Sequence, residues 1–198
     1  MIKPMGRKKE RQALATTAIH GRAEPHRAGD PVVPAIVQSV NFVQEVGTAA
    51  GLQYPRYGNT PNAERVQKRI ALLEGAEASL VLSSGMGATA CAMLALLRPG
   101  DHLLASTLIY GGTHRLFTEE FVRHGIDVTL VDPLEPRAWR RRLRKETRAI
   151  FIESPVNPTC RVLDIRPISA LTKEAAEISG ITYVMDVDKA EAEAILKA

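Results

Sequence analysis

The apolar positions of the 198-residue sequence change their spacing in a regular cycle from about residue 64 onward. Stretches with an apolar residue every three or four positions alternate with short runs of consecutive apolar residues. The first spacing is typical of a helix with one buried face, and the second of a strand buried on both faces. The pattern predicts helices at 62–74, 87–97, 113–123, 136–145 and 166–178, and strands at 79–82, 102–105, 126–131, 149–152 and 181–186.

This alternation of strands and helices predicts an α/β fold, in which a parallel sheet is covered by helices and the crossovers are right-handed. Residues 1–63 do not follow the cycle, because they are rich in Pro, Gly and polar residues. We interpret them as an extended N-terminal arm that packs on another surface. Residues 64–186 then form the α/β domain, and residues 187–198 form a helix-prone tail.

Composition excludes few classes of protein. The chain is 45% hydrophobic and 24% charged, which is typical of a soluble globular protein. Its net charge of +4 comes largely from two basic clusters, one near the N-terminus and one at 137–148. No nucleic-acid-binding motif accompanies the second cluster. We therefore interpret it as the solvated face of a helix and expect no nucleic-acid partner.

Cysteine usage and hydropathy indicate the compartment. Cys91 and Cys160 lack the spacing of a metal or redox pair, so we expect no metal site and a reducing environment. The longest nearly apolar run, ATACAMLALL at 88–97, is too short to span a bilayer. The basic N-terminus also lacks the apolar core of a signal peptide. We therefore expect a cytoplasmic protein with no membrane partner.

Chemistry-bearing residues follow four of the predicted strands. Gly85 and Met86 lie in the small-residue turn SSGMG, which opens a helix and would let backbone N–H groups approach a phosphate. Tyr110 follows the next strand and precedes two glycines, Asn157 lies in the loop SPVNPT, and Asp186 ends the run TYVMD. In an open parallel sheet, ligands bind at the carboxyl ends of the strands.

These four strand ends would together offer a phosphate cradle, a ring to stack, an amide and a carboxylate. That set suits a phosphorylated pyridine ring, and hence pyridoxal 5′-phosphate, whose enzymes pair an acid with the pyridinium nitrogen. The turn SSGMG lacks the Lys of a P-loop and the GxGxxG spacing of a dinucleotide site. Nucleotide binding is therefore disfavoured.

Six segments in order resemble the N-terminal half of the cystathionine γ-synthase-like family of pyridoxal-phosphate enzymes, over roughly residues 16–186. They are AIHG at 18–21, YPRYGNTPN at 54–62, LLEGAEASLVLSSGMGA at 72–88, GDHLLASTLIYGGTHRLF at 100–117, ESPVNPT at 153–159 and TYVMD at 182–186. The resemblance implies the three-layer large domain of the fold-type I transferases, here truncated. It also implies transsulfuration chemistry, which is elimination or γ-replacement on cystathionine, O-acylhomoserine or methionine-type substrates.

The resemblance also implies a role for each residue. The amides of Gly85 and Met86 would hold the cofactor phosphate, and Tyr110 would stack on the pyridine ring and assist proton transfer. Asn157 would bond the ring hydroxyl, and Asp186 would hold the pyridinium charge. The phosphate would also be reached from a neighbouring subunit, since intact relatives are dimers or tetramers. The residues that would do so are Tyr54 and Arg56.

The resemblance ends after Asp186. In the family a further strand and a Ser/Thr-rich motif lead to the lysine that forms the Schiff base, whereas here the sequence continues VDKAEAEAILKA. Neither Lys189 nor Lys197 matches that position, so we assign neither as catalytic. We therefore expect a truncated enzyme that is weakly active or inactive alone. The alternative is a non-catalytic protein of the same family that pairs with other subunits.

Overall fold

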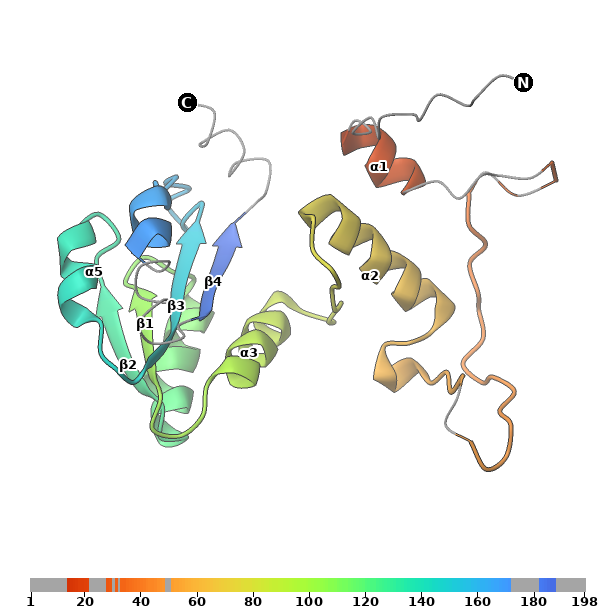
Figure 1. The fold of residues 1–198 in the computed structure, drawn as a ribbon, viewed down its shortest axis with the longest axis horizontal. Helices are drawn as coiled ribbons and strands as arrows, with labels where there is room; N and C mark the ends of the chain where they lie inside the picture. Colours follow the sequence, from red (N-terminus) through yellow and green to blue (C-terminus); the bar gives the residue numbers. More distant parts are fainter. Residues whose placement is uncertain are drawn as a thin grey trace, which may run out of the picture. The chain divides into compact units, whose positions relative to one another are not determined.

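Four parallel strands form a sheet in the C-terminal part of the chain, which we describe from a computed structural model (Figure 1). The structure describes residues 14–21, 28–29, 31, 33–48, 51–171 and, for the backbone alone, 182–187. The chain divides into two units, with the boundary between Val81 and Leu82. The sheet lies in the second unit.

The strands have the spatial order β2-β1-β3-β4 and pair in parallel throughout. From β1 the chain crosses to β2 on one side, and from β2 it returns to β3 on the other side of β1. The carboxyl ends of β1 and β3 therefore flank a switch point, where ligands bind in open α/β sheets. The strands are β1 (His102–Ser106), β2 (Asp127–Val131), β3 (Thr147–Ser154) and β4 (Thr182–Val187).

Helices cover both faces of this sheet, because alternate strand residues point to opposite sides. Leu103 and Phe151 join a cluster with the end of one helix and with a π-helical stretch, whereas Leu104 and Ile150 pack in a second cluster around Trp139. The sheet is thus the middle of three layers. The helical elements are α3 (Gly85–Leu96), α4 (Gly111–Arg115), its π-helical continuation η2 (Leu116–Phe121), α5 (Pro136–Arg142) and residues 166–171.

The first unit contains α1 (Leu14–His20), the short 3-10 turn η1 (Pro55–Tyr57) and α2 (Pro61–Glu74). Pro61 opens α2, and Gly75 ends it in a left-handed conformation with φ of 67°. The preceding chain is tied to α2 by a pair of bonds: the Val37 N–H donates to Asn62 Oδ1 at 3.0 Å, and Asn62 Nδ2 donates to the Val37 carbonyl at 2.8 Å. The arm expected at 1–63 therefore includes two short helical elements and an extended stretch.

Two element predictions differ from the structure. The strand predicted at 79–82 is wrong: this stretch joins the two units, and Leu80 and Val81 are 66% and 45% exposed. An apolar run becomes a strand only when a neighbour pairs with it, and the run itself does not show whether one exists. The helix predicted at 136–145 ends at Arg142, because Leu143 is extended and the Arg144 N–H donates to Thr147 Oγ1.

The remaining elements lie within a few residues of their predicted positions. Strand β3 is longer than expected at both ends, and the helix predicted at 166–178 is observed as far as residue 171. The rest of that helix and the tail at 188–198 lie outside the described residues. Among the described residues, no helix combines the length and the apolar character that crossing a membrane requires.

Candidate cofactor site

The N-terminus of α3 presents the turn that the sequence marks as a phosphate cradle. Ser84 caps the helix, since its extended backbone lets Oγ accept the Gly87 N–H at 3.0 Å. The first-turn amides of Gly85 and Met86 precede any intrahelical acceptor. A Cβ built on Gly85 would meet no atom within 4 Å, so this side of the turn is open. The cradle therefore has both the donors and the space for an anion.

Tyr110 lies at the N-terminus of α4, just after β1, and is 46% exposed. Its ring lies over Gly112, where an added Cβ would come within 2.5 Å of Tyr110 Cε1 and 3.2 Å of Met86 Sδ. Thr113 Oγ1 also approaches that sulfur, at 3.7 Å. The N-terminus of α3, with Met86, and the N-terminus of α4, with Tyr110, thus approach each other at Gly112.

Asn157 is exposed in the loop after β3, and the carboxylate of Glu153 fixes its backbone. Glu153 Oε1 accepts the Asn157 N–H at 2.9 Å, and Oε2 accepts the Tyr110 N–H at 2.8 Å. Glu153 is only 8% exposed. The structure therefore brings Tyr110 and Asn157 to the same carboxylate, at the switch point between β1 and β3.

The backbone of Asp186 reaches the same edge of the sheet, because it pairs in register with Glu153 across β3 and β4. Five of the seven predicted site residues thus lie in the second unit, in the first turn of α3, just before α4, in the loop after β3 and near the end of β4. They are Gly85, Met86, Tyr110, Asn157 and Asp186.

Tyr54 and Arg56 lie in the first unit and contact each other. Arg56 Nη1 donates to Tyr54 Oη at 2.9 Å, and the guanidinium lies 5.7 Å from the centre of the Tyr54 ring. The Tyr54 ring also packs edge-on against Tyr57, with 5.2 Å between ring centres. Their predicted role at the phosphate of a neighbouring subunit stays a prediction.

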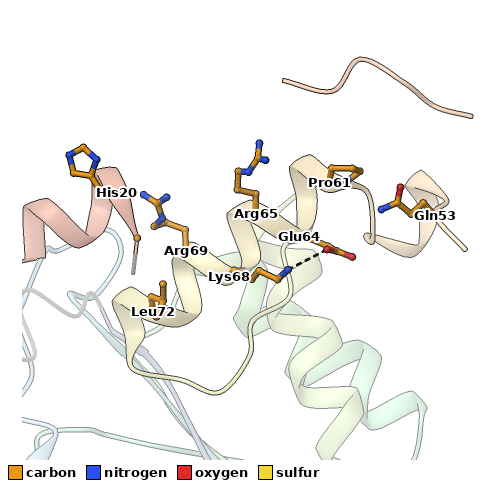
Figure 2. A pocket seen from close by; sticks show the side chains of 9 residues that line it. His20, Gln53, Pro61, Glu64, Arg65, Lys68, Arg69 and Leu72 are labelled. Atoms are coloured by element: carbon orange, nitrogen blue, oxygen red, sulfur yellow. Dashed lines mark hydrogen bonds and ion pairs between the residues drawn. The ribbon is translucent and has the colours of Figure 1, made fainter. Parts of the chain in front are cut away.

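The first unit also has a cleft of about 390 Å³ between α1 and α2 (Figure 2). Lys68 Nζ lies 3.5 Å from Glu64 Oε2, and Arg69 Nη1 donates to the Ala18 carbonyl at 2.6 Å. The cleft contains none of the predicted site residues. We therefore do not assign it to the cofactor.

One buried histidine is structural. His102 lies at the amino end of β1, the end opposite Tyr110, and its ring nitrogens are 2.8 Å from Thr147 Oγ1 and 2.9 Å from Thr129 Oγ1. Burial lowers the pKa of His102, and the nearby charge of Arg144 lowers it further. Among the described residues, no group of three His, Cys, Asp or Glu side chains could hold a metal ion.

Comparison with known proteins identifies the relatives of this arrangement. Residues 15–189 match the model of the Cys/Met metabolism PLP-dependent enzyme family. The chain belongs to this family. The Cys/Met metabolism family uses pyridoxal 5′-phosphate as cofactor, and the open cradle at α3, the ring of Tyr110 and the amide of Asn157 fit that group.

Individual members of the Cys/Met metabolism family resemble the chain over most of its length. A probable cystathionine γ-synthase of Herpetosiphon aurantiacus is 37% identical over 87% of this chain and 53% of its own. An L-methionine γ-lyase of Porphyromonas gingivalis is 36% identical over 89% of this chain and 45% of its own. The crystal structure of MetB from Corynebacterium glutamicum superposes with a TM-score of 0.77 at 30% identity, covering 88% of this chain and 45% of MetB. The chain thus spans about half the length of the curated relatives it matches.

Two residues that the sequence prediction did not name also shape the geometry around Tyr110 and Asn157, and they are Glu153 and Gly112. Glu153 ends an otherwise apolar strand run, AIFIE, and a buried carboxylate needs partners, so the position carried a signal. Gly112 carried a weaker signal, as one of two adjacent glycines after Tyr110. Only the structure distinguishes Gly112, which packs under the ring, from Gly111, which is open.

Proposed function

We propose that this chain is the cofactor-binding half of a pyridoxal-phosphate enzyme of sulfur amino-acid metabolism. Its substrates are cystathionine, O-acylhomoserine or methionine-type amino acids, and its chemistry is elimination or γ-replacement. The main support for the proposal is that Tyr110 lies near Met86 at Gly112 and is joined to Asn157 through Glu153, beside the switch point. The names of the relatives support the substrate class, since they include a cystathionine γ-synthase and a methionine γ-lyase.

Each residue has a defined task in this proposal. The amides of Gly85 and Met86 hold the phosphate at the α3 N-terminus, where the helix dipole favours an anion. The half-exposed Tyr110 ring lies against one face of the pyridine. Asn157 bonds the ring hydroxyl, and Asp186, at the end of β4, holds the charge of the pyridinium nitrogen. When bound, pyridoxal phosphate supplies an electron-withdrawing ring that stabilises negative charge developing on the substrate.

Proton transfer is the proposed catalytic task of Tyr110. Its side chain is accessible, while its backbone N–H is fixed by the buried Glu153 carboxylate. The phenol can therefore face a substrate without the loop moving. We assign no Schiff-base lysine, because Lys189 and Lys197 do not match the family motif and both lie outside the described residues.

A second copy of the chain is the proposed partner. The extended stretch at 33–46 exposes five large apolar side chains, which are between 67% and 102% exposed: Val33, Ile36, Val40, Val43 and Val46. Apolar surface of this kind is typical of an interface. In a homo-oligomer, the Tyr54–Arg56 pair of one subunit would reach the cofactor phosphate of its neighbour.

The test is a titration of the purified chain with pyridoxal phosphate, followed by visible absorbance and by borohydride reduction with peptide mapping. We expect saturable binding with no single lysine labelled. Asn157→Ala should weaken binding, whereas Thr159→Ala, at an exposed position of the same loop, should not. Non-saturable binding by the wild-type chain would refute the proposed function.

A further inference from the structure

Glu153 is a buried acid that the proposed chemistry does not use. It is the penultimate residue of β3, follows a run of apolar residues and is 8% exposed. A buried carboxylate is stable only when hydrogen-bond donors surround it. Within the described part of the chain, Glu153 accepts hydrogen bonds from the backbone N–H groups of Tyr110 and Asn157.

These two donors come from different crossovers of the fold. Tyr110 lies at the start of α4, which leads toward β2, while Asn157 lies in the loop that leads toward β4. The two residues are 43 positions before and 4 positions after Glu153. One side chain thus joins the two loops that border the switch point.

Each of the two loops is also held by a hydrogen bond that does not involve Glu153. The Thr107 N–H donates to the Val131 carbonyl at 2.9 Å, and the Leu163 N–H donates to Ser154 Oγ at 3.0 Å. These bonds hold the outer parts of the loops. The bonds to Glu153 instead set the separation between the two residues that flank the ligand. Both bonds are within the normal N–H···O range, at 2.8 Å from Tyr110 and 2.9 Å from Asn157.

We propose that Glu153 is a positioning residue, whose single carboxylate sets the distance between Tyr110 and Asn157 and so shapes the slot for the pyridine ring. The proposal rests on the proposed function, because it names the residue that aligns two of its cofactor ligands. Glu153 acts through backbone groups and does not itself touch the ring.

The variant Glu153→Gln tests this role, because it keeps the size of the side chain and replaces one acceptor oxygen by an NH₂ donor. An NH₂ group cannot accept from an N–H group, so the two loops can no longer both be held. We expect the amide hydrogens of both Tyr110 and Asn157 to exchange faster, as measured by NMR. We also expect the affinity for pyridoxal phosphate to fall about tenfold.

Asp132→Asn is the matched control. Asp132 Oδ1 accepts the Leu134 N–H at 2.8 Å. The variant therefore also replaces a carboxyl group that accepts a backbone N–H by an amide, but in a loop that contains none of the predicted site residues. It should leave the cofactor affinity within about twofold of wild type. A drop in affinity equal to that of Glu153→Gln would overturn the proposal, because the loss would then follow from charge alone.

The remaining outcomes are also decisive. Unchanged affinity in a folded Glu153→Gln chain, or faster exchange at only one of the two amides, would overturn the proposal. If the variant does not fold, the amide hydrogen-exchange rates of the wild-type chain test the proposal instead. The amides of Tyr110 and Asn157 should both exchange slowly and at similar rates. Widely different rates would contradict a shared acceptor. If wild type binds no pyridoxal phosphate, the proposed function fails, while the two amides still show whether Glu153 joins the loops.

Discussion

The ring of Tyr110 lies over the α-carbon of Gly112, so closely that a Cβ at residue 112 would come within 2.5 Å of Tyr110 Cε1. The same added atom would lie 3.2 Å from Met86 Sδ. A side chain at residue 112 would therefore displace the ring, the sulfur or both. This contact links the start of α3 to the start of α4, and it makes the placement of the Tyr110 ring depend on a residue without a side chain.

Gly112→Ala should therefore weaken the binding of pyridoxal phosphate by about tenfold or more, because the added methyl group moves the Tyr110 ring, which we propose stacks on the pyridine. Gly111→Ala is the control, since a Cβ there would meet no atom within 4 Å. Titrations of the two variants followed by visible absorbance measure the difference. Equal affinities would show that the ring position is unimportant for binding.

Gly85→Pro tests the phosphate cradle without disturbing the helix. Gly85 is the first residue of α3, where proline is well tolerated, and the preceding Ser84 already has the extended backbone that proline requires. The substitution removes one N–H donor. We expect the affinity for pyridoxal phosphate to fall about tenfold while the thermal midpoint changes little.

Gly85→Ala supplies the comparison for this cradle, because it adds a side chain in open space and keeps the N–H group. The methyl group takes some of the space proposed for the phosphate, so the affinity should fall below that of wild type, but it should stay above that of Gly85→Pro because the N–H donor remains. If both variants bind equally well, the Gly85 amide does not hold the phosphate, and the assignment of that residue is wrong.

Arg56→Ala should lower cofactor affinity only where subunits are assembled, because the Tyr54–Arg56 pair is proposed to act on a neighbouring subunit. Isothermal titration at two protein concentrations, paired with analytical ultracentrifugation, separates the two cases. We expect wild type to bind more tightly at the higher concentration and Arg56→Ala to lose that gain. Tyr54→Phe, which removes only the phenol oxygen, should have a smaller effect. A concentration-independent affinity in wild type would contradict the intersubunit role.

The lowered pKa of His102 should make the free energy of unfolding depend on pH. Burial and the charge of Arg144 lower its pKa from the ordinary value of 6.5, whereas Asp127 and Glu146 act in the opposite direction. The unfolded chain therefore binds a proton more readily than the folded chain. The contribution of neutral His102 to the free energy of unfolding should be complete above about pH 6.5, and the free energy of unfolding should fall as the pH drops below that value.

Urea unfolding between pH 7.5 and pH 5 measures this effect of His102. His102→Gln should be less stable than wild type at pH 7.5, since its bonds to Thr147 and Thr129 are disturbed, but should lose less stability on acidification. His124→Gln, at an exposed position, should keep the wild-type slope. An identical slope in wild type and His102→Gln would refute the assignment.

The sequence predicted the α/β layers well, because the buried strands are short apolar runs whose alternate residues serve two cores. Leu103 and Leu104 are adjacent in β1 and join opposite clusters, as the parallel-sheet interpretation requires. The stretch around Leu80 and Val81 has the same apolar character and is not a strand. The difference lies in whether a neighbouring strand is present, which is a property of the tertiary structure.

The sequence predicts the positions of Tyr110 and Asn157 better than their contacts. Each follows a strand within a few residues, and the carboxyl ends of parallel strands lie at the same end of the sheet, so both residues were expected there. The role of Glu153 depends on a partner 43 residues earlier in the chain, and local spacing does not reveal such a contact. The contact between Gly112 and the Tyr110 ring was likewise visible only in three dimensions.

We propose above that pyridoxal phosphate binds at the switch point between β1 and β3. The most direct measurement is a ¹⁵N NMR titration of the labelled chain with pyridoxal phosphate. We expect the amide signals of Gly85, Met86, Tyr110 and Asn157 to shift together and to saturate at one ligand per chain. Shifts confined to the cleft around Lys68 and Arg69, or no saturable shifts, would contradict it.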